Sequence, residues 1–213
     1  MKFQELLAIA GNEPIIESSL LLAGDVKPGD VHRQLSRWQD AKLLHQLRRG
    51  LYLLAEPYRK TTPHPFRAAN LLQRPSYVSC QSALAWYGLI PEYVPSVVSV
   101  TTGRTGEWQT EMGEMLYRHV KKDLFWGYGS VEVAPGQQAF IAKPEKALLD
   151  LIYLQPGADD KNYLAELRLQ NWEQLDMSGL ARMAEQSGSA KLMRAARHLN
   201  VLALDAIDFY EAL

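Results

Sequence analysis

Cysteine is almost absent from this 213-residue sequence, in which Cys80 stands alone. A single cysteine excludes an intramolecular disulfide and a CxxC zinc site, and it fits a reducing compartment, so we expect a cytoplasmic protein with Cys80 in its core. Long apolar runs are missing too, because none approaches the roughly 20 residues that a membrane-spanning helix needs. The opening residues, MKFQELLAIAGNE, lack the features of a signal peptide, so we expect neither membrane insertion nor export.

Motifs for catalysis and cofactor binding are also missing. The five histidines are scattered, without the HxH or HExxH spacing of metal sites. The sequence has no phosphate-binding P-loop, no GxSxG nucleophile elbow and no GxGxxG dinucleotide motif. We therefore expect a protein that is not an enzyme and that carries no cofactor and no metal.

A metal-dependent nuclease is the enzymatic alternative that the residues leave open. Its chemistry needs two carboxylates and a lysine around a divalent ion, and Asp123, Glu132, Glu145 and Lys146 are residues of these types. Glu145 and Lys146, however, fall at the start of a predicted helix. There, a favourable interaction with the helix dipole and a surface lysine explain them without catalysis.

The composition is that of an ordinary folded protein, with 47% hydrophobic and 22% charged residues, and the length allows one or two domains. The net charge of −1 does not identify a partner, but positive charge is concentrated in one segment. Between residues 27 and 74 only Asp30, Asp40 and Glu56 oppose a basic set, which consists of Lys27, Arg33, Arg37, Lys42, Arg48, Arg49, Arg59, Lys60, Arg67 and Arg74. Such a segment can bind DNA within a neutral protein, with a gentler salt dependence than a basic protein shows.

Residues 26–54 have the pattern of a helix followed by a hairpin. Val31, Leu35 and Trp38 form one apolar stripe of a helix that ends near residue 41 or 42, and Pro28 suits its first turn. Two apolar runs, 44–47 and 51–54, flank a turn that contains Gly50, which is typical of a hairpin. Two short helices are predicted before it, over residues 2–10 and 15–22. This layout predicts a winged helix-turn-helix in residues 1–60, although a basic helix face is equally typical of solvated surface.

If the segment binds DNA, its polar residues divide into two groups. The outer face of the helix would contact base edges through His32, Arg33, Ser36 and Arg37. Phosphate contacts would come from Lys27, Lys42, Arg48 and Arg49.

The rest of the chain predicts an α+β domain over residues 76–213, after a linker and connecting helix over 61–75. Strands are expected at 77–79, 97–101, 115–120, 131–134 and 138–142, and residues 102–106 are expected to form a loop. Helices are expected at 80–87, with Ser79 as N-cap and Gly88 just after its end, and at 144–154. The C-terminal part is predicted to be helical over 160–169, 177–186, 190–199 and 205–213.

Four segments resemble the AbiEi-type antitoxins. Residues 77–91 (YVSCQSALAWYGLIP) resemble that family's YxSxxSALxxxGLxP segment, and residues 97–102 are similar to its following strand. Residues 141–151 (IAKPEKALLDL) resemble its xAxPEKALLDL block, and residues 49–52 (RGLY) are similar to its RGxY wing. The four segments occur in the family's order and span most of the chain.

This resemblance implies a two-domain bacterial repressor that acts as the antitoxin of a type IV toxin–antitoxin system, an abortive-infection operon. It implies binding to inverted repeats in the double-stranded DNA of its own promoter. It also implies that the chain counters a nucleotidyltransferase-like toxin without a stable complex. A stand-alone winged-helix regulator, with a second domain that senses a ligand or dimerises, remains an alternative, as does the nuclease.

Overall fold

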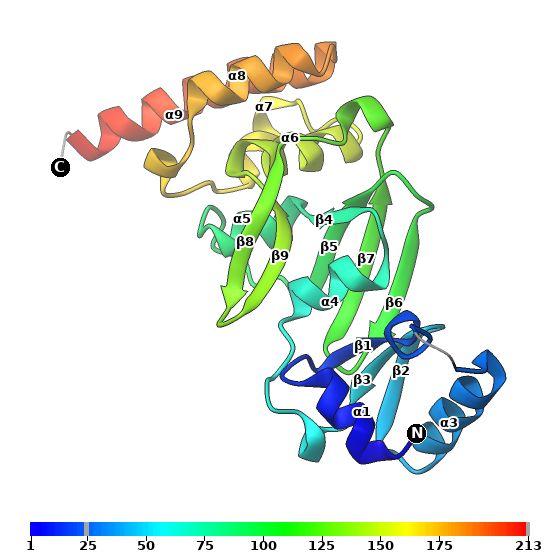
Figure 1. Ribbon diagram of the computed structural model, residues 1–213. Coiled ribbons are helices and arrows are strands. Elements are labelled where there is room, and N and C mark those ends of the chain that lie inside the picture. The colour runs from blue at the N-terminus through cyan, green and yellow to red at the C-terminus, as the bar shows by residue number, and fades with distance from the viewer. Residues whose placement is uncertain (24–25, 212–213) are drawn as a thin grey trace.

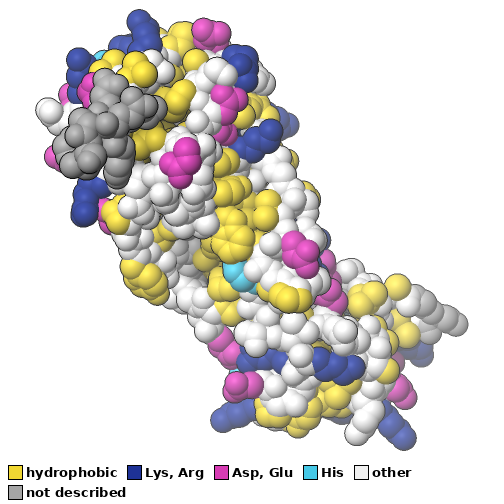
Figure 2. All heavy atoms as spheres, turned by 90° about the vertical axis from the view of Figure 1, so that its left-hand side faces the viewer, with side chains coloured by type: hydrophobic (Ala, Val, Ile, Leu, Met, Phe, Trp, Pro, Cys, Tyr) yellow, Lys and Arg dark blue, Asp and Glu magenta, His cyan; other side chains and the backbone are white. Residues whose placement is uncertain are grey.

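The computed structural model describes residues 1–23 and 26–211, and it has the expected mixed α+β architecture (Figure 1). The molecule is elongated (Figures 1 and 2). Residues 1–54, the N-terminal unit, lie at one end around a three-stranded sheet. Residues 65–211, the second unit, surround a six-stranded sheet and end in two helices at the opposite end.

The N-terminal unit places three helices against a small antiparallel sheet. Its elements are α1 Phe3–Ala10, β1 Ile15–Glu17, α2 Ser18–Leu21, α3 Pro28–Asp40, β2 Leu44–Arg48 and β3 Leu51–Leu54. The strand order is β1-β3-β2, so the chain after α1 pairs with the second strand of the hairpin. The hairpin and the helix before it agree with the prediction.

The single helix predicted over residues 15–22 is wrong. Ile15 and Ile16 form β1, where Ile15 is opposite Leu53 and Ile16 is opposite Tyr52, and the helix begins only at Ser18. Two consecutive β-branched residues favour a strand. Both are buried, on opposite faces of the sheet, and a helix would not place neighbouring side chains on opposite sides of one layer.

The three-stranded sheet is buried on both faces, which joins the two units. All four residues of β3 are buried. Tyr52 and Leu54 pack with α1 and α3, whereas Leu51 and Leu53 belong to the hydrophobic core of the second unit. The N-terminal unit is therefore packed directly against the second unit.

The connection between the units includes a short 3-10 helix, Glu56–Tyr58, and then α4 Pro65–Leu72. The connecting helix predicted within residues 61–75 is present as α4, and it is packed into the second unit. Ala68 and Ala69 are fully buried in the core of the second unit, and α4 packs on the six-stranded sheet.

The sheet of the second unit has the strand order β6-β7-β5-β4-β9-β8. Its strands are β4 Ser76–Val78, β5 Ser96–Thr101, β6 Gly106–Thr110, β7 Gly113–His119, β8 Tyr128–Ala134 and β9 Gln137–Ala142. The β5–β7 and β4–β9 pairs are parallel, and the other neighbours are antiparallel. Strand β6 was not predicted, because Trp108 is the only apolar residue of its sequence, GEWQT, so the segment lacks the apolar alternation of the predicted strands.

The remaining helices of the second unit are α5 Cys80–Trp86, α6 Pro144–Leu154, α7 Lys161–Glu166, α8 Met177–Gln186 and α9 Ala190–Glu211, with short 3-10 helices at Lys122–Leu124 and Trp172–Gln174. The separate helix predicted from residue 205 is wrong, because α9 runs through that point without a break. Neither glycine nor proline lies between residues 199 and 205 to end it. Residues 212–213 of that prediction lie outside the described residues. None of the helices in the described residues has the length and apolarity to cross a membrane.

Candidate functional site

The four residues predicted to contact DNA bases lie together on the solvent face of α3. His32, Arg33, Ser36 and Arg37 are all exposed. The opposite face of the helix is fixed by a buried stripe, Val31, Leu35 and Trp38, in the small core of the N-terminal unit. The apolar stripe therefore determines which polar side chains face outward.

The start of α3 contributes charge of both signs. Lys27 is the N-cap residue and is exposed, and Pro28 occupies the first helical position. Arg33 forms an exposed ion pair with Asp30 at 2.6 Å. A cavity of about 620 Å³ beside this turn is lined by Lys27, Asp30, Arg33 and Arg37 among others. To contact a phosphate or a base, the Arg33 guanidinium would have to share or leave its pairing with Asp30.

Lys42 lies at the other end of α3 and is exposed. Its backbone is in the left-handed region, with φ of 55°. The N–H of Lys42 donates to the carbonyl of Gln39, and the N–H of Leu43 donates to the carbonyl of Trp38. These two bonds form a Schellman motif, in which glycine usually occupies the position of Lys42. The lysine is therefore held at the helix end by a strained but hydrogen-bonded turn.

The two arginines of the hairpin turn lie in different environments. Arg49 is exposed. Arg48 is partly buried, and its Nη2 donates to the carbonyl of Leu71 in α4 at 3.2 Å. Its Nε is buried and has no hydrogen-bond partner among the described residues. Arg48 thus lies at the interface, or seam, between the two units, although the sequence predicts it as a phosphate contact.

A second feature is a buried polar cluster in the second unit. Lys146 and Asp150 form an ion pair across one turn of α6, and each side chain is 3% exposed. The hydroxyl of Ser79 donates to Asp150 Oδ2 at 2.7 Å, and that of Tyr77 donates to the same oxygen at 2.9 Å. The interpretation of Lys146 as a surface lysine is therefore wrong.

Burial dominates the electrostatics of this cluster. It raises the pKa of the Asp150 carboxyl, while the Lys146 ammonium and the two hydroxyl donors act in the opposite direction. Burial also raises the pKa of Tyr77, and the nearby Asp150 carboxylate adds to that rise. The Cys80 thiol has a pKa raised by burial as well, so it is held in the unreactive thiol form.

Of the other residues that prompted the nuclease alternative, Glu145 and Glu132 have hydrogen-bond partners of their own. Glu145 is buried and accepts a hydrogen bond from the backbone N–H of Asp176 at 2.8 Å, which joins α6 to the start of α8. Glu132 is exposed and accepts from the N–H of Gly136 in the β8–β9 turn. Asp123 is exposed on a 3-10 helix. Within residues 1–23 and 26–206, no group of three histidine, cysteine or acidic side chains suited to a metal is present.

Ser79, which belongs to the same cluster, has a different role from the predicted one. It does occupy the N-cap position of α5, but its side chain forms no capping hydrogen bond and instead contacts Asp150. Gly88 follows the helix with φ of 67°, and its neighbour Leu89 donates to the carbonyl of Leu84. The end of α5 is thus as predicted.

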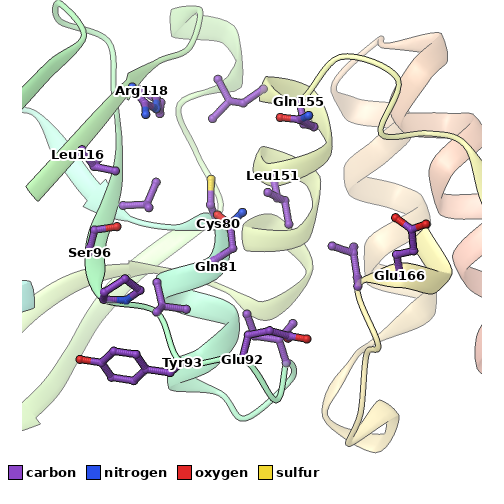
Figure 3. A pocket seen from close by; sticks show the side chains of 16 residues that line it. Cys80, Gln81, Glu92, Tyr93, Ser96, Leu116, Arg118, Leu151, Gln155 and Glu166 are labelled. Carbon is purple, nitrogen blue, oxygen red and sulfur yellow. The ribbon is translucent and has the colours of Figure 1, made fainter. Parts of the chain in front are cut away.

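Cys80 also lies at a cavity of about 660 Å³ between α5, α6, β5 and β7 (Figure 3). Apolar residues such as Leu116 and Leu151 line much of it, and the charged residues Glu92, Arg118 and Glu166 are of both signs. This mixed lining does not favour a ligand of one charge.

Comparison with family models gives no match, and comparison with curated proteins gives none either.

Proposed function

We propose that the N-terminal unit is a winged helix-turn-helix and that the protein is a sequence-specific DNA-binding transcriptional repressor. The order of the elements supports this: a helix, a strand, two further helices and a hairpin, with the first strand paired to the second strand of the hairpin. In this proposal α2 and α3 are the helix-turn-helix, α3 lies in the major groove, and the β2–β3 hairpin is the wing.

The observation that carries the proposal is the outer face of α3. His32, Arg33, Ser36 and Arg37 lie on one exposed face, while the other side of the helix is fixed in the core. Arginine can bind guanine O6 and N7 through two hydrogen bonds in the major groove, and histidine and serine can also contact base edges. A rigid helix with such a face has the chemistry of direct readout.

Phosphate contacts in this proposal come from Lys27, Lys42 and Arg49, which are exposed at the two ends of α3 and at the hairpin turn. Arg48 is left out, because its guanidinium is already bonded to Leu71 of α4. Three lysine and arginine contacts per N-terminal unit predict a moderate salt dependence of binding.

We further propose that the repressor acts as an antitoxin that counters a nucleotidyltransferase-like toxin. The resemblance to AbiEi-type antitoxins is the support for this step. Its two longest segments, 77–91 and 141–151, both contribute to the buried polar cluster of the second unit. Tyr77 and Ser79 come from the former, and Lys146 and Asp150 come from the latter. The shared residues thus have a common structural task in building the second unit.

DNA binding is tested by fluorescence anisotropy with DNA from upstream of the gene and with scrambled DNA of the same composition, at two salt concentrations. We expect tighter binding to the upstream DNA and weakening with salt. Equally weak binding to both DNAs would contradict the proposal.

The antitoxin step is tested separately, in cells that express the nucleotidyltransferase-like protein of a neighbouring gene. We expect growth arrest by that protein alone and recovery when this chain is co-expressed. If no such neighbour exists, or if recovery fails while DNA binding holds, the protein is instead a stand-alone regulator.

A further inference from the structure

A cavity of about 690 Å³ opens between α4 and the β4–β9–β8 side of the large sheet. It lies within the size range of small-molecule sites, which are concave and mostly apolar with a few directed polar groups. Its polar groups include Arg67, Arg74, Asn70 and Ser130. Two of these are cationic and none is acidic, so the lining favours an anion.

The apolar wall of this cavity, the α4 cavity, is aromatic and held in place. Tyr128 stacks on the buried Tyr77 with ring centroids 4.4 Å apart, and the Tyr77 hydroxyl is fixed by Asp150. Phe125 packs against both tyrosines, and Phe140 meets Tyr128 edge to face at 5.9 Å. A flat ring fits such a preformed wall, because aromatic pairs favour offset stacking and edge-to-face contacts.

Phe140 is 49% exposed and lies in the wall of the α4 cavity. Its backbone is fixed on both sides: the N–H donates to Asn70 Oδ1 at 2.6 Å, and the carbonyl accepts from Asn70 Nδ2 at 3.4 Å. The exposed ring is therefore positioned by the strand and by α4. An aromatic ligand would cover it.

The two arginines also attach the N-terminal unit. Arg67 Nη2 donates to Glu13 at 2.6 Å, just before β1. Arg74 donates through both Nη atoms to the two carboxylate oxygens of Glu17, at 3.0 and 3.3 Å, at the end of β1. Both guanidinium groups therefore lie beside the cavity and at the contact with the N-terminal unit.

We propose that the α4 cavity binds a small planar aromatic anion, with its ring against Tyr128 and Phe140 and its carboxylate or phosphate on Arg67 and Arg74. Arginine is suited to either group, because its planar fork makes two parallel hydrogen bonds. The ligand shares these arginines with Glu13 and Glu17. Ligand binding therefore competes with the two ion pairs that attach the N-terminal unit, so the ligand weakens that attachment. The inference does not rest on DNA binding.

Three probes with one ring system test the proposal by isothermal titration calorimetry on the full chain: 2-naphthoate, 2-naphthyl phosphate and the neutral 2-naphthamide. We expect at least one anion to bind about tenfold more tightly than the amide, since a charged hydrogen bond is lost in the amide. Whichever anion binds more tightly identifies the acidic group. The proposal is overturned if no probe binds at millimolar concentration, or if the amide binds as well as both anions.

Substitutions in the cavity locate the binding. Arg74→Gln should weaken the anion about tenfold and leave the amide unchanged. Phe140→Ala removes an exposed ring without touching an ion pair, so it should weaken all three probes while the protein stays folded. Tyr93→Ala, at another exposed aromatic residue, is the control and should change nothing. Anion binding that survives both Arg74→Gln and Phe140→Ala would place it elsewhere and overturn the proposal.

A separate variant tests the competition between Glu17 and the ligand for Arg74. Glu17→Gln removes a negative charge that shares Arg74 with the ligand, so it should strengthen anion binding several-fold. Glu111→Gln is the matched control, because Glu111 also makes a polar contact between the units, to His45 Nδ1 at 2.6 Å, away from this cavity. Equal anion affinity in Glu17→Gln and the wild-type protein would contradict the shared use of Arg74.

Discussion

Lys146 Nζ lies against Asp150 Oδ1 across one turn of α6, with both side chains almost completely buried. Removing one partner of a buried ion pair leaves an uncompensated charge, so Lys146→Met should lower the free energy of unfolding by about 3–5 kcal/mol. Adding Asp150→Asn should restore part of this loss, because a neutral amide still accepts a hydrogen bond from Tyr77 or Ser79. Urea denaturation of both variants gives the values. A double variant less stable than Lys146→Met would contradict the account.

The same pair shows how far the sequence predicts this structure. The helix over residues 144–154 is predicted at its observed bounds, because Pro144 and the apolar residues that follow are local signals. The burial of Lys146 was not predicted, because it depends on α5, α8 and the sheet, which surround α6. A usable signal was present: lysine and aspartate four residues apart, inside an otherwise apolar helix, are spaced to pair with each other.

The N-terminal unit shows a similar limit. The stripe of α3 and the hairpin were predicted from local periodicity, and so was the solvent face that carries His32 and Arg37. The strand β1 was not predicted, because its partner β3 is more than 30 residues away and only that pairing explains Ile15 and Ile16. The seam position of Arg48 likewise depends on a distant contact, the carbonyl of Leu71.

His64 makes the stability of the protein dependent on pH. Its Nδ1 accepts a hydrogen bond from the N–H of Phe66 and caps α4, and burial lowers its pKa from the usual 6.5. The folded state thus favours neutral histidine. This contribution is complete above pH of about 6.5 and is lost as the pH falls through the lowered pKa.

His64→Asn provides the test, because asparagine is a good N-cap residue and does not titrate in this range. The thermal unfolding temperature should fall more between pH 7 and pH 5 for the wild-type protein than for His64→Asn. His64→Ala should lose about 1 kcal/mol at pH 8 through the missing cap. Parallel pH profiles for the wild-type and His64→Asn proteins would exclude this role.

Lys42 is the residue in the left-handed turn that ends α3, where Gly88 has the same role after α5. Lys42→Gly should raise the free energy of unfolding by about 0.5–1 kcal/mol, since relief of left-handed strain exceeds the added entropy of the unfolded chain. Lys42→Ala keeps the strain and should give no such gain. Urea unfolding distinguishes the two, and equal stability of both variants would mean that the turn is not strained.

Arg48 and Arg49 are neighbours with different expected effects. Arg48→Ala leaves the carbonyl of Leu71 without its donor and should lower stability by about 1–3 kcal/mol. Arg49→Ala alters an exposed side chain and should change stability by less than about 0.5 kcal/mol. In DNA titrations, Arg49→Ala should reduce the slope of log affinity against log salt by about 1, whereas Arg48→Ala should leave it unchanged. The reverse pattern would place Arg48 on the DNA.

Substitutions of Arg33 and Arg37 distinguish sequence readout from general attraction between positive charge and DNA. Each is exposed on the outer face of α3, so Arg33→Ala or Arg37→Ala should cost about 1–3 kcal/mol on the upstream DNA and much less on scrambled DNA. Lys27→Ala should weaken both DNAs alike, because a phosphate contact carries no sequence information. Arg104→Ala, on an exposed loop of the second unit, is the control for a general loss of positive charge. If the two α3 variants weakened both DNAs equally, α3 would contribute charge alone and would not lie in the major groove.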